Sequence, residues 1–173
     1  MNKLIAMALV LGAVAGVGQA ADPVEFKVGD FEFDRPAEWG WVVPGSPMRK
    51  AQLATPDEGE VTFFHFGPGQ GGSVQQNIQR WVNQFDGGAT GSKGMQREET
   101  YGETKVTYVT ASGTFNSGMP GGPTTPMANY GLLGAILESE GGDVFVKMTG
   151  PDEAVKNALG TFETMIEGAA TGD

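Results

Sequence analysis

The chain has 173 residues, of which 21 are acidic and 11 are basic, so its formal net charge is −10, and it contains no cysteine. An electric field of this sign repels nucleic-acid phosphates and anionic lipid headgroups, so the composition predicts neither nucleic acid nor a membrane surface as a partner. Disulfides are excluded, and because His65 is the single histidine, the histidine–cysteine zinc patterns are excluded too.

The first 20 residues, "MNKLIAMALVLGAVAGVGQA", have the pattern of a secretory signal peptide. Lys3 precedes an apolar run from Leu4 to Val17, and Gly18 and Ala20 stand at the −3 and −1 positions of a cleavage site. The run is shorter than the roughly 20 residues that span a bilayer as a helix. We therefore expect cleavage near Ala20, a periplasmic or secreted location without membrane insertion after signal removal, and a single domain over residues 21–173.

Alternation of apolar and polar residues predicts several short strands in the first part of this domain. Residues 24–28 and 31–33 alternate on either side of Gly29-Asp30, a pair that suits a tight hairpin turn. Two further strands are expected at Arg49–Ala54 and Glu60–Phe66, around the turn sequence "TPDEG".

The spacing of apolar residues changes to that of an α-helix at Ser73, and Gly87-Gly88 ends this pattern. Strand pairs are expected around Tyr101-Gly102 and around Gly141-Gly142, and a second helical pattern has Pro151 at its first position. Runs of consecutive strands, rather than strict alternation of strand and helix, indicate an α+β fold. The expected structure is an antiparallel β-sheet with two main amphipathic helices packed on it.

Gly67, Gly69 and Gly72 have the G-x-G-x-x-G spacing of a dinucleotide-binding turn. That motif belongs to a parallel βαβ unit with an acidic residue about 20 positions further on. Because the strand before Gly67 is expected to be antiparallel, we interpret the glycines as a structural loop and predict no cofactor.

His65 is the single candidate for a histidine general base, and it shares a strand face with Phe63. Neither a G-x-S-x-G elbow nor another nucleophile signature accompanies it. We therefore predict no catalytic residue and no enzymatic activity. The alternative is an exported hydrolase that uses His65 with a nearby carboxylate.

Two clusters of acidic residues lie beside predicted turns. They consist of Asp57, Glu58 and Glu60, and of Glu138, Glu140 and Asp143. Calcium prefers several oxygens that converge from a short loop, but the EF-hand pattern is absent. Solvated hairpin ends are the favoured interpretation, with no metal site, and calcium binding by the second cluster is an alternative.

The segment from Asn116 to Ala128 is predicted to be a long loop and is the candidate for partner contact. It contains Met119 and Met127, and methionines suit an adaptable contact surface. We expect Trp41 and Tyr130 to lie near it, because exposed aromatic residues contribute strongly to interfaces. The partner would be an unknown protein or a small ligand.

The stretches "FEFDRPAEW", "YGLLGAIL…GGDVFVKMTGP" and "DEAVKNALGTFETMIEG" together resemble the PsbP-like fold family. This family includes the photosystem II extrinsic protein PsbP and a yeast Ran-binding nuclear-import factor. The resemblance implies an α/β/α sandwich around an antiparallel sheet, with a late amphipathic helix. It also implies a non-catalytic binding or assembly-support module, and it identifies no functional residue in this chain.

Overall fold

The computed structural model describes residues 22–88, 94–118 and 122–172. The predicted signal peptide therefore lies outside the described residues, as does Met119. The elements are, in chain order, β1 (Glu25–Val28), β2 (Phe31–Asp34), β3 (Gly40–Trp41), β4 (Arg49–Ala54), β5 (Glu60–His65), α1 (Val74–Val82), β6 (Met95–Tyr101), β7 (Thr104–Gly118), β8 (Thr124–Leu137), β9 (Val144–Pro151) and α3 (Asp152–Thr171).

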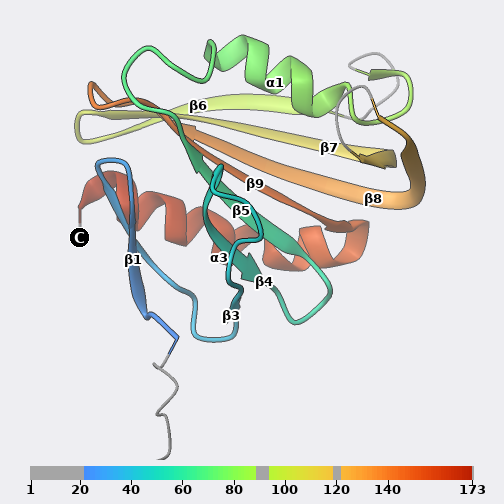
Figure 1. The fold of residues 1–173 in the computed structure, drawn as a ribbon, viewed down its shortest axis with the longest axis horizontal. Helices are drawn as coiled ribbons and strands as arrows, with labels where there is room; N and C mark the ends of the chain where they lie inside the picture. The colour runs from blue at the N-terminus through green and yellow to red at the C-terminus, as the bar shows by residue number, and fades with distance from the viewer. Residues whose placement is uncertain (1–21, 89–93, 119–121, 173) are drawn as a thin grey trace, which may run out of the picture.

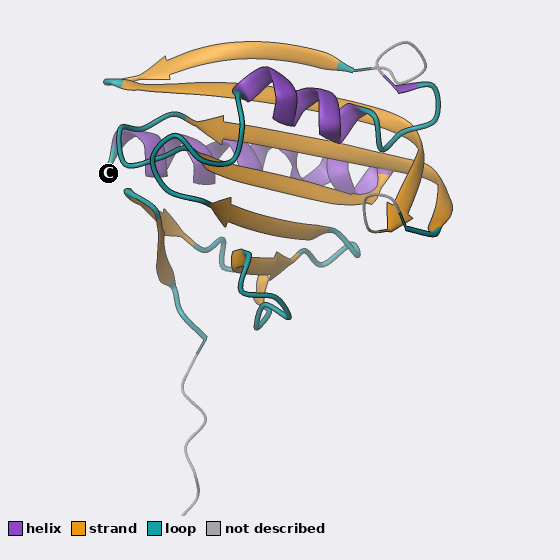
Figure 2. Ribbon diagram, turned by 45° about the horizontal axis from the view of Figure 1, so that its top comes forward, coloured by secondary structure: helices purple, strands orange, loops and turns teal. Residues whose placement is uncertain are grey.

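One sheet of seven strands runs in the order β3-β4-β5-β9-β8-β7-β6, and every neighbouring pair in it is antiparallel. The strands β1 and β2 form a separate hairpin. Figures 1 and 2 show α1 and α3 on opposite faces of the sheet. The predicted α+β class, with an antiparallel sheet between two helices, is confirmed.

The face of the sheet that α3 covers holds the larger core. Alternate residues of the strands point to this face, so Phe63 of β5 and Met148 of β9 are fully buried there. The β1–β2 hairpin closes the same core: the ring centroids of Phe26 and Phe33 lie 5.0 and 5.1 Å from that of Phe63. The N-terminal hairpin is thus a structural part of the domain.

The opposite face is covered by α1, whose first turn is well capped. The Ser73 hydroxyl accepts a hydrogen bond from the Gln76 backbone N–H at 3.2 Å, and the Gln76 side chain accepts one from the Ser73 N–H at 2.9 Å. Trp81 is buried against the sheet at Gly134, where an added methyl group would overlap the indole ring. This close approach places α1 over the β7–β8 part of the sheet and leaves β5 and β9 less covered on this face.

The glycine loop before α1 has a structural role in this arrangement. Strand β5 is antiparallel to both of its neighbours, as the interpretation of the glycines required. The φ angles of Gly67 and Gly69 are +88° and +67°, in the region that favours glycine. The backbone of Gly67 packs directly on Gly142 in the β8–β9 turn. The loop therefore packs on the β8–β9 turn. The backbone N–H groups of Ser73 and Gln76, which could otherwise donate to a phosphate, donate within the capping box of α1 instead.

The structure corrects the expectation that the segment Asn116–Ala128 is a long loop. Its ends belong to β7 and β8, with Asn116 paired to Pro126 and Ser117 paired to Thr125, so the expected long loop is largely a strand pair. The partner strand β9 pairs with β8 only from Tyr130 onward. This end of β8 therefore has an open edge, where the missing N–H of a proline is tolerated. The short strand β3 was not predicted either.

None of the helices in the described ranges combines the length and the apolar character that are needed to cross a bilayer.

Candidate binding site

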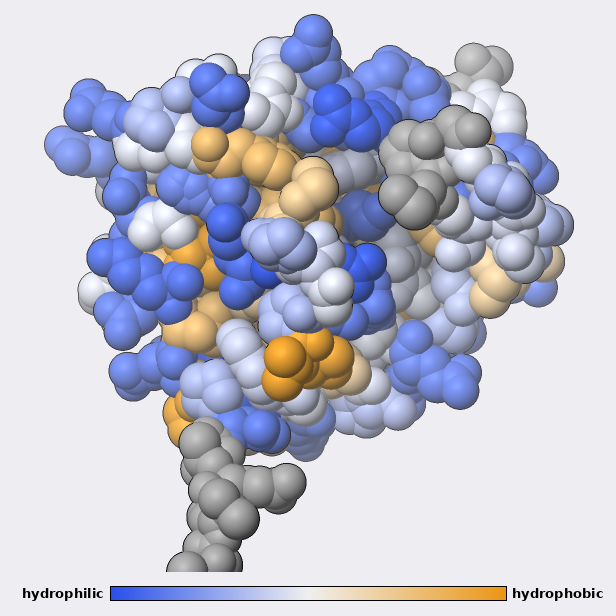
Figure 3. Space-filling view, in the orientation of Figure 1, coloured by the Kyte–Doolittle hydropathy of each residue, from blue (hydrophilic) through white to orange (hydrophobic). Residues whose placement is uncertain are grey.

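A cavity of about 560 Å³ opens on the α1 face, beside the helix and over β5 and β9. We call it the α1 pocket. Its lining in the described part of the chain consists of Met48, Phe64, Phe66, Asn77, Arg80, Trp81, Asn83, Gln84, Asn116, Gly118, Thr124, Phe145 and Lys147. This set contains aromatic rings, amides and two cations, but no carboxylate. Figure 3 shows apolar atoms gathered below α1, bordered by hydrophilic ones.

The apolar part of the α1 pocket is made of phenylalanine rings from neighbouring strands. The ring centroids of Phe64 and Phe66 are 6.4 Å apart and nearly parallel, and those of Phe66 and Phe145 are 6.1 Å apart. Phe66 is 38% exposed, and Met48 at the rim is 59% exposed. Large apolar side chains that stay accessible around one hollow are typical of a binding surface.

The polar centre of the α1 pocket is Lys147. Because residues two apart in a strand point to the same face, β9 places Lys147 beside Phe145 on the side of the sheet that carries α1. Its Nζ donates a hydrogen bond to Gln84 Oε1 at 2.8 Å and lies 5.6 Å from the centroid of the Phe115 ring. Burial lowers the pKa of Lys147 to about 8, against a smaller opposing effect of Glu60.

Three other polar side chains of the α1 pocket are held by neutral partners or by a neighbour outside it. Arg80 donates through Nη1 to Asn77 Oδ1 at 2.9 Å, and Asn77 Nδ2 in turn donates to the Gly71 carbonyl at 2.9 Å. Asn116 donates to Asp86 Oδ1 at 2.7 Å, and Asp86 does not line the cavity. Although the protein has a net charge of −10, the described lining of this pocket thus contains two cations and no acidic residue.

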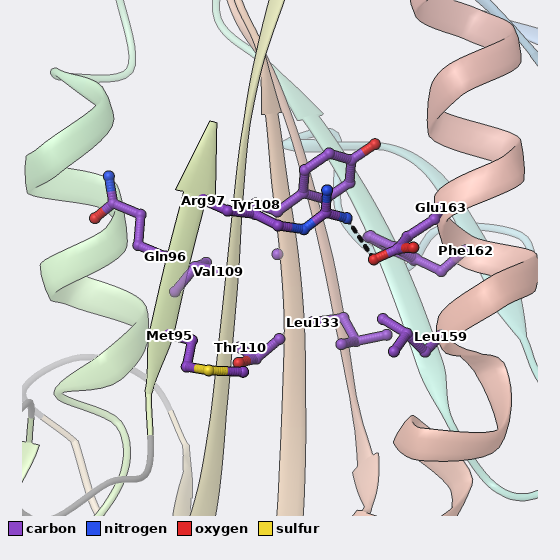
Figure 4. Close-up of a pocket in the computed structure, with 11 residues that line it drawn as sticks. Met95, Gln96, Arg97, Tyr108, Val109, Thr110, Leu133, Leu159, Phe162 and Glu163 are labelled. Atoms are coloured by element: carbon purple, nitrogen blue, oxygen red, sulfur yellow. Dashed lines mark hydrogen bonds and ion pairs between the residues drawn. The ribbon is translucent and has the colours of Figure 1, made fainter. Parts of the chain in front are cut away.

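A smaller cavity of about 160 Å³ lies on the other face, between the β6–β7 edge and α3 (Figure 4). Its charged groups satisfy each other: Arg97 is 2.5 Å from Glu163 Oε1 and lies over the Tyr108 ring at 4.2 Å. Burial raises the pKa of Tyr108, so that group stays neutral. With its charges paired and its volume small, this cavity offers less to a ligand than the α1 pocket.

The predicted contact residues do not form one surface. Trp41 on β3 packs against Phe26, at 5.4 Å between ring centroids, on the α3 face. Met127 and Tyr130 belong to the α1 face, where the Tyr130 ring stacks on Phe115 at 6.0 Å. The expectation that Trp41 lies near Tyr130 is wrong, because β3 and β8 lie apart in the sheet and turn these side chains to opposite faces. Whether any of them contacts a partner stays a prediction.

His65 lies at the end of β5, on the face opposite Phe64. It faces the β1–β2 turn, where a methyl group on Gly29 would lie 2.7 Å from its Nδ1. Among the described residues, its buried Nε2 has no hydrogen-bond partner, and no carboxylate or hydroxyl is bonded to the ring. The structure therefore supplies no triad around His65, and the absence of catalysis stays a prediction.

Two members of the second acidic cluster make contacts within the protein. Glu138 lies 3.5 Å from Lys105 Nζ, and Asp143 accepts a hydrogen bond from the Ser139 N–H at 3.3 Å. Within residues 22–88, 94–118 and 122–172, no three histidine, cysteine, aspartate or glutamate side chains are placed to hold a metal ion. The calcium alternative thus finds no site in Glu138, Glu140 and Asp143.

Sequence reasoning missed Lys147, Gln84 and Phe145, which come together only in the folded chain. One local signal was present in "DVFVKMTG": a lysine at an alternate position of an otherwise apolar strand. Such a lysine must face a covered surface, and a buried cation is a sign of a functional site.

Comparison with known proteins defines the class of fold. No family model matches the chain, and no curated protein matches its sequence. Among solved structures, the chain is similar to the solution structure of cyanobacterial PsbP (CyanoP) from Synechocystis sp. PCC 6803. The TM-score is 0.53 at 13% identity, over 90% of this chain and 95% of that chain. The fold is therefore PsbP-like, and at this identity the likeness concerns the fold alone.

Proposed function

We propose that this protein is an exported, non-catalytic binding module that receives a small ligand, or a group of a partner protein, in the α1 pocket. The observation that carries the proposal is the environment of Lys147, a cation in an apolar cavity whose hydrogen-bond partner is a neutral amide. The PsbP-like fold supports a binding or assembly-support role for it. Export is supported by the pattern of the first 20 residues.

The size and lining of the α1 pocket suit a small-molecule site. Ligand pockets commonly measure roughly 300–1,000 Å³, with mostly apolar walls and a few polar groups that orient the ligand. Removing a charge from water is costly unless a counter-charge or several hydrogen bonds compensate for it. A ligand that completes the surroundings of Lys147 would supply that compensation.

A binding role fits the lining better than a chemical one. A lysine with a lowered pKa is also a nucleophile for carbonyl groups, but such enzymes need a second group to transfer protons. In the described lining, the neighbours of Lys147 are amides, aromatic rings and an arginine. These groups can hold and orient a ligand, whereas none of them is of a kind that commonly serves as a general acid or base.

Export makes a direct prediction about the mature chain. We expect N-terminal sequencing of the protein from the exported fraction to begin at Ala21, because Gly18 and Ala20 are the small residues that signal peptidase requires. An Ala20→Phe variant should accumulate as the full-length precursor. Recovery of the wild-type protein as an uncleaved precursor in the cytosolic fraction would contradict export.

Binding at the α1 pocket is tested by NMR titration with a small-molecule fragment set that contains neutral, anionic and cationic members. We expect hits to shift the backbone amides of Gln84, Phe145 and Lys147. A His65→Ala variant is the matched control and should bind the same fragments, because His65 faces the other side of the sheet. Hits confined to the cavity beside Arg97, or none at all, would contradict the proposed function.

A further inference from the structure

We propose that the ligand of the α1 pocket is an organic monoanion, a carboxylate joined to a flat apolar group. The carboxylate lies at Lys147 and Gln84, and the apolar group lies among the rings of Phe64, Phe66 and Phe145. This inference rests on the proposed function, since it names the chemical class of ligand for the same pocket.

The hydrogen-bond capacity of the polar centre determines the head group. An ammonium has three N–H donors, and in the described part of the chain Lys147 uses one of them, toward Gln84 Oε1. The Gln84 amide has its own N–H₂ group beside the ammonium, and it has no acceptor among the described residues. One carboxylate can accept from both groups, and hydrogen bonds between charged partners are the strong ones.

The charge of the lining excludes the other head groups. A cationic ligand would meet Lys147 and Arg80 with no carboxylate in the described lining to offset them. A neutral ligand would cover the Lys147 ammonium and leave its charge uncompensated. A multiply charged anion would meet the field of a protein of net charge −10, while the second cation of the described lining, Arg80, is already bonded to Asn77. A single negative charge fits these three conditions.

The aromatic side chains of the α1 pocket determine the shape of the apolar half of the ligand. The ring planes of Phe64 and Phe66 are inclined by only 14° to each other, and the exposed Phe66 ring also lies next to the ring of Phe145. Trp81 of α1 also lines the cavity. Flat rings stack on aromatic walls in offset or edge-to-face contact, which favours an aromatic or planar apolar group.

The test uses three probes that share one ring system and differ in head group: 1-naphthaleneacetate, 1-naphthaleneethanol and 1-naphthylethylammonium. Affinities are measured by calorimetry at pH 7, with the amide shifts of Gln84 and Lys147 to locate the binding. We expect the acetate to bind about tenfold or more tightly than the alcohol, and the ammonium more weakly than both. Acetate without the ring should bind far more weakly than 1-naphthaleneacetate.

Three variants separate the charge from the ring contacts. Lys147→Met should remove the preference for 1-naphthaleneacetate over the alcohol while the alcohol still binds. Gln84→Glu, which places a carboxylate beside the ammonium and leaves Lys147 in place, should reverse that preference and tests the same point independently. Phe66→Ala should weaken all ring probes by the same factor, because Phe66 contacts the ring and not the head group.

The outcomes distinguish the two levels of the proposal. If the acetate and the alcohol bind the wild type equally, or if the ammonium binds best, the monoanion inference is overturned while the pocket remains a binding site. If no naphthalene probe shifts the pocket amides while other fragments do, the inference is likewise overturned. If neither the probes nor the fragment set bind there, the proposed function itself fails.

Discussion

A Phe63→Ala variant is expected to lose about 3–5 kcal/mol of the free energy of unfolding. The Phe63 side chain is fully buried, and its ring makes edge contacts with Phe26 and Phe33 at 5.0 and 5.1 Å between centroids. Removing it leaves a cavity between the sheet and the β1–β2 hairpin that the stiff strands on both sides cannot fill. Urea denaturation followed by circular dichroism measures the loss.

The matched control for this prediction is Phe66→Ala, which removes the same ring at a position that is 38% exposed. Because that ring leaves much less of a cavity, we expect a loss of about 1 kcal/mol or less. Similar losses for the two variants would contradict the packing of the hairpin on the sheet.

A Lys147→Met variant is expected to be more stable than the wild type at pH 7, by up to about 3 kcal/mol. Burial lowers the pKa of Lys147 from 10.5 to about 8, so the folded protein releases this proton at a lower pH than the unfolded chain. Between these two pKa values the unfolded state binds more protons, and the stability of the wild type therefore rises with pH. Below pH 8 the full cost of the buried charge remains.

The measurement compares urea denaturation of both proteins from pH 7 to pH 10, where the difference in stability should stay constant up to about pH 8 and then shrink as the pH rises further. Other groups titrate equally in the two proteins, so the difference isolates Lys147, whose nearest charges are those of Glu60 and Arg49. Lys147→Arg keeps a charge at this position and should show no gain at pH 7. A gain for Lys147→Met that stays constant up to pH 10 would mean that packing, and not charge, is responsible.

The sequence determined the fold class because the relevant signals are local. Strands of alternating residues, the Gly29-Asp30 turn and the capping residue Ser73 each depend on neighbours only a few positions away. The observed helices begin at Val74, directly after the predicted cap Ser73, and at Asp152, one residue after Pro151, which the pattern placed at the first helical position. The Asn116–Ala128 segment was missed because its glycine and proline residues indicate a loop locally, while the long β7–β8 ladder continues into it and pairs its two ends with each other.

Only the tertiary structure decided where a ligand could bind. Lys147 and Gln84 are far apart in the sequence and meet because β9 lies centrally in the sheet and α1 crosses the same face. Neither residue belongs to a sequence motif. A single lysine indicates a binding site only when the fold surrounds it with aromatic rings and places no carboxylate with it in the described lining. Periodicity depends on residues that are close in the sequence. The desolvation of one charge depends on every group that packs around it, and those groups come together only in the folded chain.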